Sequence, residues 1–212
     1  MEMAARCLRA SAALLMLSSV AVAAQQLLDR VLARVGGEPI TLTDVQAAIG
    51  LGVIQPTGAD LIASATQQLI DRQLILAEVQ RFPPPEPAPT AVAREVARLT
   101  MNAGPALPKL MQSTGVGEER IREIARDDLR ILAYLDQRFG TAAQVSDEEV
   151  AAYYRDHQAE FQSGGGDAAP FEEVAAIARQ RASDARRRAT VDQWIRDLRA
   201  RADISINSPP TG

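Results

Sequence analysis

The sequence predicts a mostly helical domain with one small sheet built from both ends of the chain. Aromatic residues make up only 4% of a chain that is 47% hydrophobic, so Leu, Ile, Val and Ala must supply most of the core. Such a core fits packed helices better than a β-sandwich. Apolar residues recur at helical spacing over much of residues 59–202, whereas residues 31–35 and 204–206 alternate as strands do.

The segment 29–45 has the pattern of a strand, a tight turn, a second short strand and the start of a helix. Gly36–Gly37 can take the positive φ values that a two-residue hairpin turn requires. Pro39 limits the return strand to an edge or a first position. Thr41 or Thr43 can cap the following helix. Two short strands are not stable alone in water, so we expect a third strand at residues 204–206.

Upstream of this hairpin, the chain has the organisation of a secretory signal peptide. Arg6 and Arg9 precede the mostly apolar run 10–22, and small residues at 21–24 suit cleavage. We therefore expect residues 1–24 to be removed on export. The alternative is an uncleaved anchor, but the apolar run is shorter than the roughly 20 residues of a spanning helix.

Composition excludes several classes of function. Cys7 is the single cysteine and lies before the expected cleavage site, so the mature chain would have no disulfide, thiol nucleophile or thiolate metal site. The formal net charge of −4 argues against a nucleic-acid partner, which needs a concentrated basic face.

The first long helix is expected at residues 59–81, followed by the proline-rich run 82–89. Proline removes a backbone donor and clashes within a helix, so this run ends the helix sharply. We interpret the run as a stiff connector with extended polyproline geometry. The alternative is a ligand for a proline-recognition domain.

Three further helices are expected at residues 90–102, with Thr90 as the cap, at 105–114 and at 118–139. The apolar stripe of the last of these follows steps of three and four residues and includes Ile121, Ile124, Asp128, Leu132, Leu135 and Phe139. Asp128 marks the margin of this stripe. We expect the stripes of 69–79 and 121–135 to face the core.

The C-terminal third predicts two more helices and the closing strand. Ser146 and Glu149 form a capping box that opens a helix towards residue 161. After a glycine-rich break, Pro170 occupies a favoured first-turn position of a final helix that extends through residues 185–202. Residues 204–206 then form the closing strand.

Conventional catalytic and metal-binding patterns are lacking, so we assign no catalytic, cofactor-binding or metal-binding residues and expect no cofactor. His157 is the single histidine and, beside Glu160, fits a packing role better than a catalytic one. The acidic run 147–149 belongs to a helix cap. The run Gly164-Gly165-Gly166-Asp167 lacks the lysine and hydroxyl residue of a phosphate loop.

Six arginines of the last helix could form a basic stripe: Arg179, Arg181, Arg186, Arg187, Arg188 and Arg196. Asp184, Asp192 and Asp197 dilute this charge along the same segment. We therefore interpret the stripe as a solvated helix face.

The order of these motifs resembles that of the SurA-type periplasmic chaperone family. Residues 29–45 resemble the family's opening segment, and residues 69–78 resemble its signature on the second main helix. Residues 145–161 are similar to the segment that leads into a parvulin-type prolyl isomerase domain. The segments from Phe171 to Arg199 and at 202–206 resemble the returning helix and last strand.

One departure from the family is large. Members commonly carry one or two parvulin domains between the last two segments, whereas here only residues 162–170 separate them. A parvulin domain needs on the order of 100 residues, a typical small-domain length. The resemblance therefore implies the chaperone role without isomerase activity.

The resemblance implies a single chaperone domain of the kind shared by SurA and trigger factor, over residues 25–206. Its N-terminal part would span 27–161, its returning helix and strand 170–206, and its linker 162–169, with a tail at 207–212.

The expected function is that of a periplasmic chaperone that binds unfolded outer-membrane or exported polypeptides without catalysis. Such clients could pair with an exposed edge of the small sheet. The alternatives are an atypical peptidyl-prolyl isomerase and a dedicated envelope assembly partner. We expect no nucleic-acid partner and no stable membrane insertion after cleavage, and the client-binding residues and oligomeric state stay unassigned.

Overall fold

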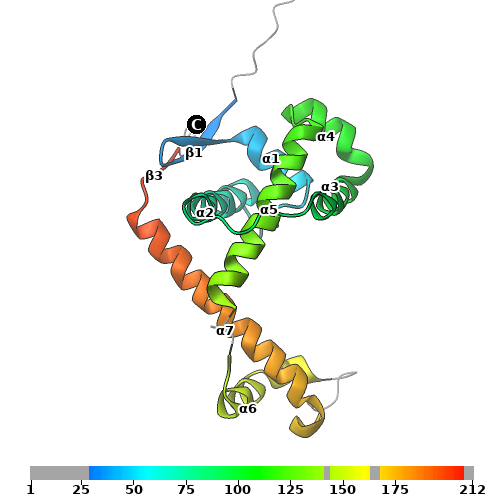
Figure 1. Cartoon of the computed structure of the whole chain (residues 1–212), viewed down its shortest axis with the longest axis vertical. Helices are drawn as coiled ribbons and strands as arrows, with labels where there is room; N and C mark the ends of the chain where they lie inside the picture. Colours follow the sequence, from blue (N-terminus) through cyan, green and yellow to red (C-terminus); the bar gives the residue numbers. More distant parts are fainter. Residues whose placement is uncertain (1–28, 141–143, 163–167, 208–212) are drawn as a thin grey trace, which may run out of the picture.

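The computed structural model describes residues 29–140, 144–162 and 168–207, and it has an elongated shape in which one long helix joins two lobes (Figure 1). The predicted signal peptide, the run 164–167 and the tail from residue 208 lie outside the described residues. In chain order the elements are β1 (Val31–Val35), β2 (Glu38–Thr41), α1 (Leu42–Gly50), α2 (Leu61–Arg81), α3 (Pro89–Ala103), η1 (Gly104–Ala106), α4 (Leu107–Thr114), α5 (Glu118–Phe139), α6 (Asp147–Asp156), η3 (Gln158–Phe161), α7 (Phe171–Arg201) and β3 (Ile204–Ile206). The predicted mostly helical fold with a small sheet is confirmed.

The three strands form one antiparallel sheet in the order β2-β1-β3. The tight turn between β1 and β2 uses Gly36 and Gly37, whose φ angles of 57° and 89° favour glycine. β2 lies at an edge, as Pro39 predicts, and β3 pairs with the other side of β1. The predicted closure of the hairpin by residues 204–206 is therefore confirmed.

The predicted helix caps are partly correct. Thr41, one of the two residues considered, caps α1 in a reciprocal capping box with Asp44, and Ser146 caps α6 with Glu149 in the same way. The prediction for Thr90 is wrong, because α3 begins one residue earlier, at Pro89. At the first position of a helix the backbone N–H has no partner within the helix, so a proline, which lacks this group, is tolerated there.

Two predicted helices are interrupted by tight 3-10 turns. The helix expected at 105–114 divides into η1 and α4, and the helix expected over 146–161 divides into α6 and η3. The final helix, by contrast, runs unbroken for 31 residues, and Pro170 lies just before its first residue instead of within the first turn.

The upper lobe consists of the sheet, α1–α5 and the C-terminal half of α7. It contains two clusters of buried side chains. One joins the sheet to α1, α2, α5 and α7, and the other joins α1, α3, α4 and α5. Ile70, Leu74 and Val79 of α2 are buried, as expected. Leu132 of α5 is 60% exposed. The prediction that it belongs to the core is therefore wrong.

The C-terminal half of α7 is fixed to the upper lobe by aromatic packing and by one arginine. The Trp194 ring centroid lies 5.9 Å from that of Tyr134 and 5.3 Å from that of Phe139, both on α5. Arg199 donates to the carboxylate of Asp71 and, at 2.8 Å and 2.9 Å, to the side-chain and backbone oxygens of Gln67 on α2. The two ends of the described chain are thus held on one core.

The lower lobe consists of residues 144–162 and 168–186. Val150, Phe161 and Ala178 form its small buried cluster, with Tyr154 and Phe171 packed around them. Figure 1 shows it at the far end of α7 from the sheet.

Candidate functional site

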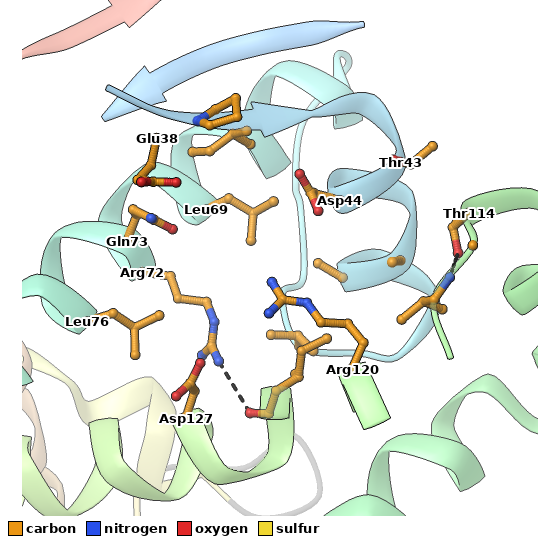
Figure 2. Close-up of a pocket in the computed structure, with 18 residues that line it drawn as sticks. Glu38, Thr43, Asp44, Leu69, Arg72, Gln73, Leu76, Thr114, Arg120 and Asp127 are labelled. Atoms are coloured by element: carbon orange, nitrogen blue, oxygen red, sulfur yellow. Dashed lines mark hydrogen bonds between the residues drawn. The ribbon is translucent and has the colours of Figure 1, made fainter. Parts of the chain in front are cut away.

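A pocket of about 360 Å³ opens in the upper lobe between β2 and α1 on one side, α2 on another, and the α4–α5 connection on the third. Figure 2 shows its lining residues arranged around a common space. Its apolar walls come from Pro39, Ile40, Ala47, Ala48, Val53, Leu69, Leu76, Val116 and Ile124. We call this space the hairpin pocket.

The local sequence explains why the hairpin pocket has these walls. The sharp turn at Gly36–Gly37 places β2 directly before α1, so strand and helix contribute neighbouring side chains. On α2, Leu69 and Leu76 are seven residues apart, which places them on one helix face. Both are only partly buried, so this face lines the pocket beside the fully packed Ile70.

Charged groups surround the apolar walls. Figure 2 shows Arg72, Arg120 and Asp127 turned towards the space from α2 and α5. The Arg72 guanidinium lies 2.5 Å from an oxygen of Asp128, and it donates to the backbone oxygen of Ile124 at 3.4 Å. Because the side chains of Arg72 and Asp128 are only 17% and 11% exposed, this ion pair is held largely away from water.

Burial raises the pKa of Asp128 above its usual range, and the positive charge of Arg72 opposes that increase only in part. Burial likewise raises the pKa of Asp127, again against the charge of Arg72. The carboxylates of Glu38, Asp44 and Asp127 and the guanidinium groups of Arg72 and Arg120 therefore line the pocket, with Asp128 beside Arg72. The result is a mixed apolar and charged surface, not a site selective for one sign of charge.

This geometry suits the reversible binding of a polypeptide segment. Apolar side chains can enter between Leu69, Leu76 and Ile124, while the surrounding charges can contact polar groups. No histidine or cysteine lines the pocket. Across the described residues, no group of three or more His, Cys, Asp and Glu side chains could hold a metal ion.

His157 and the residues that flank the glycine-rich run, Gln162 and Ala168, lie in the lower lobe instead. The His157 ring is stacked on Tyr153 with centroids 4.0 Å apart, and its Nδ1 lies 2.9 Å from the Tyr153 backbone oxygen. The stacking fits the expected packing role. At the linker, Gln162 and Ala168 form an isolated antiparallel bridge, and the Ala169 N–H donates to the Phe161 oxygen at 3.1 Å. The residues on either side of the linker are thus held close together.

The arginine stripe of α7 is largely exposed, as predicted, and several of its arginines also form ion pairs with neighbouring segments. Arg179, Arg181 and Arg186 pair with Asp147, Glu160 and Glu149, respectively, all from the α6–η3 segment. Arg187 reaches Asp136 on α5 at 3.4 Å. The stripe therefore connects α7 to neighbouring segments. Aspartates of α7 such as Asp184 and Asp197 instead accept hydrogen bonds from glutamines of the same helix.

The sequence did not identify the Arg72–Asp128 pair or the hairpin pocket. Asp128 was placed at the margin of an apolar stripe, and its partly buried position is consistent with that. A charged residue at such a position is a signal for a partner on a facing helix. The identity of that partner depends on tertiary packing, because Arg72 and Asp128 are 56 positions apart in the chain. The periodic pattern does not contain that information.

Comparison with solved structures finds a similar fold over most of the chain. The fold is similar to a structure described in work on the virulence factor PEB4 and the periplasmic protein Cj1289, two structurally related SurA-like chaperones of Campylobacter jejuni. The TM-score is 0.55 and the sequence identity is 11%, over 85% of this chain and 100% of the other. This similarity shows that the chain shares the fold of that structure.

No protein-family model and no curated protein sequence matches the chain. Among the described residues, none of the helices combines the length and apolar character that crossing a membrane requires.

Proposed function

We propose that the protein is a periplasmic chaperone that holds unfolded exported polypeptides, including outer-membrane proteins, without catalysing a reaction on them. The observation that carries the proposal is the similarity of its fold to a SurA-like chaperone along 85% of the chain. The order of the sequence motifs points to the same family. The predicted signal peptide supports export, and the proposal covers the whole of residues 25–206 as one chaperone unit.

The hairpin pocket supplies a physical basis for such binding. A chaperone of this kind binds the unfolded state and lowers its free concentration, so it requires accessible apolar surface more than chemical groups. Leu69 and Leu76 supply that surface, and the charges around them let one site accept varied segments. Weak and varied contacts are sufficient, because a client must leave again to fold.

Suppression of aggregation tests the proposal. The mature chain, from residue 25, is mixed with a urea-unfolded outer-membrane β-barrel protein during dilution, and light scattering is recorded. We expect scattering to fall as the chaperone approaches a one-to-one ratio. Unchanged scattering at a tenfold excess would contradict the proposal.

A matched pair of variants locates the activity. Leu76→Ser changes the pocket, whereas Leu61→Ser changes a leucine on the same helix that is 51% exposed and does not line the pocket. Only the first should weaken suppression, and thermal unfolding of both checks that they fold. A protease-coupled prolyl isomer assay on the same preparation tests the enzymatic alternative, and we expect no activity above background.

A further inference from the structure

The small sheet has two edges, and their backbone groups differ. Hydrogen bonds run from Gly36 N–H to Asp203 oxygen at 2.9 Å and from Asn207 N–H to Leu32 oxygen at 2.8 Å. In an antiparallel ladder, residues alternate between bonding the neighbouring strand and pointing away from it. With Arg34 paired to Ser205 midway between these bonds, residues 203, 205 and 207 bond towards β1.

The β2 edge offers no free donor to an added strand. Pro39 pairs with Arg34, and the backbone groups of Arg34 bond to β3. The backbone groups of Pro39 therefore point away from β1, towards the outer edge of the sheet. Proline has no N–H to present there. The next N–H in that direction, from Thr41, donates to the Asp44 carboxylate at 2.9 Å within the capping box. The β2 edge is therefore blocked.

The β3 edge is open. Because residues 203, 205 and 207 bond towards β1, the N–H and C=O groups of Ile204 and Ile206 point outward. β3 is the terminal strand of the sheet in the part of the chain that the structure describes. These four backbone groups form a short template for another strand.

The side chains of β3 distinguish its two faces. Ile204 and Ile206 lie on the same face as their partners Val35 and Ala33, both of which are buried. Ile204 packs against the core, whereas Ile206 is 52% exposed. The opposite face carries Ser205 beside Arg34, and both are exposed. One face of the open edge is thus apolar and the other is polar.

We propose that the outer edge of β3 receives an extended segment of unfolded polypeptide in which apolar and polar side chains alternate. The added strand bonds to the backbone of Ile204 and Ile206. Its apolar side chains extend the face of Ile204 and Ile206, and its polar side chains lie beside Ser205. This inference rests on the proposed function and names the class of client segment.

The occupant follows from the two-faced edge. An added strand that is apolar on both faces leaves one apolar face exposed beside Ser205, and a fully polar strand leaves Ile206 exposed. A segment with a period of two matches both faces. Strands of membrane β-barrels have this alternation, which agrees with an unfolded outer-membrane protein as client. The edge lies across the sheet from the β2 side that lines the hairpin pocket, so the two surfaces can be altered separately.

The test uses a fluorescein-labelled dodecapeptide of alternating Val and Thr, measured by fluorescence anisotropy. Ile206→Pro removes one outward N–H, as proline does naturally at position 39, and Ile206→Val is the control that keeps it. Loss of one hydrogen bond predicts a roughly threefold to tenfold weaker affinity for the proline variant and no more than about a twofold change for the valine variant. Equal affinity of the two variants would overturn the inference.

A second measurement needs no protein variant, so it stands even if Ile206→Pro lowers the melting temperature. The same peptide with N-methyl groups on its four central residues cannot pair on either edge. We expect it to bind the unaltered chain at least tenfold more weakly, and equal binding of both peptides would contradict strand addition. If sedimentation shows a dimer that Ile206→Pro converts to a monomer, the occupant is a second copy, and the inference is overturned.

The aggregation assay separates this inference from the function on which it rests. If the unaltered chain suppresses aggregation and Ile206→Pro suppresses it equally, strand addition fails while the chaperone role stands. If the unaltered chain does not suppress aggregation, the proposed function itself fails.

Discussion

The two lobes are stabilised in different ways. The upper lobe has extensive buried clusters, into which Trp194 and Leu198 pack from the C-terminal half of α7. In the described residues, the buried cluster of the lower lobe consists of only three side chains, surrounded by ion pairs whose side chains are at least 40% exposed. Exposed pairs contribute only about 0–1 kcal/mol each, whereas burial of a large apolar side chain contributes about 1.5–3 kcal/mol. The upper lobe should therefore determine the stability of the whole chain.

This difference explains how α7 can belong to both lobes. Its C-terminal half is held by Trp194 and Arg199, whereas its N-terminal half carries the lower lobe through Ala178 and surface arginines. An element with few buried contacts opens locally at lower cost than the global unfolding free energy. The lower lobe should consequently open without loss of the sheet or the hairpin pocket.

The largest expected effect is that of Trp194→Ala. Removal of this buried ring from between Tyr134 and Phe139 should lower the free energy of unfolding by about 3–5 kcal/mol, because the site cannot collapse around the cavity. Chemical denaturation followed by circular dichroism measures this change. Leu132→Ala, at an exposed site on the same lobe, is the control and should change stability by less than about 0.5 kcal/mol. Similar losses for both would contradict a core centred on Trp194.

Removal of Arg72 should have the next largest effect. Arg72→Met leaves the buried Asp128 carboxylate without its closest partner and should cost about 3 kcal/mol, measured as before. Arg98 lies 3.6 Å from the same carboxylate but is 45% exposed. Arg98→Met is therefore the matched control and should cost less than about 1 kcal/mol. An equal cost for both arginines would remove the distinction between the buried and exposed partners.

Phe161→Ala tests the independence of the lower lobe. Loss of this ring removes the largest buried side chain of its cluster, and Phe→Ala changes in cores cost about 3–5 kcal/mol where they act. We expect faster amide hydrogen exchange in α6 and η3, while α2 and α5 keep their protection. A uniform increase across both lobes would show that they unfold as one cooperative unit.

The smallest effect is a dependence of stability on pH. Because burial raises the pKa of Asp128 in the folded state, the folded chain binds this proton more readily than the unfolded chain. This carboxyl group therefore favours folding increasingly as pH falls from neutral towards the ordinary value of 3.8. Asp128→Asn lacks the effect, so the stability of the unaltered chain relative to this variant should rise over that range. A relative stability that falls instead would indicate a lowered pKa.

The sequence was sufficient for the elements whose causes are local. The turn at Gly36–Gly37, the edge position of Pro39 and the capping box at Ser146 follow from backbone and cap chemistry within a few residues. The pairing of β3 with β1 followed from the requirement that a short hairpin find a partner. The prediction of Thr90 as a cap was wrong because the neighbouring Pro89 begins the helix by a different mechanism.

The contacts that build the site are long-range, and periodicity does not determine them. The pattern that placed Leu132 in the core gave the correct helix, but the packing of α5 left that position in solvent. The partners of Arg186 and Asp128 lie on other elements of the folded chain. For the same reason, the hairpin pocket could not be predicted from the stripes of α2 and α5 alone.

The central claim is that unfolded polypeptide is held on this fold at the open sheet edge. Residue-resolved hydrogen exchange at Ile204 and Ile206 is its most direct test. Exchange is measured on the mature chain alone and with saturating alternating Val/Thr peptide. We predict that both amides exchange at least fivefold more slowly with the peptide, while the amide of Ser205, already bonded to β1, changes little. Bound peptide with unchanged exchange at Ile204 and Ile206 would contradict the account.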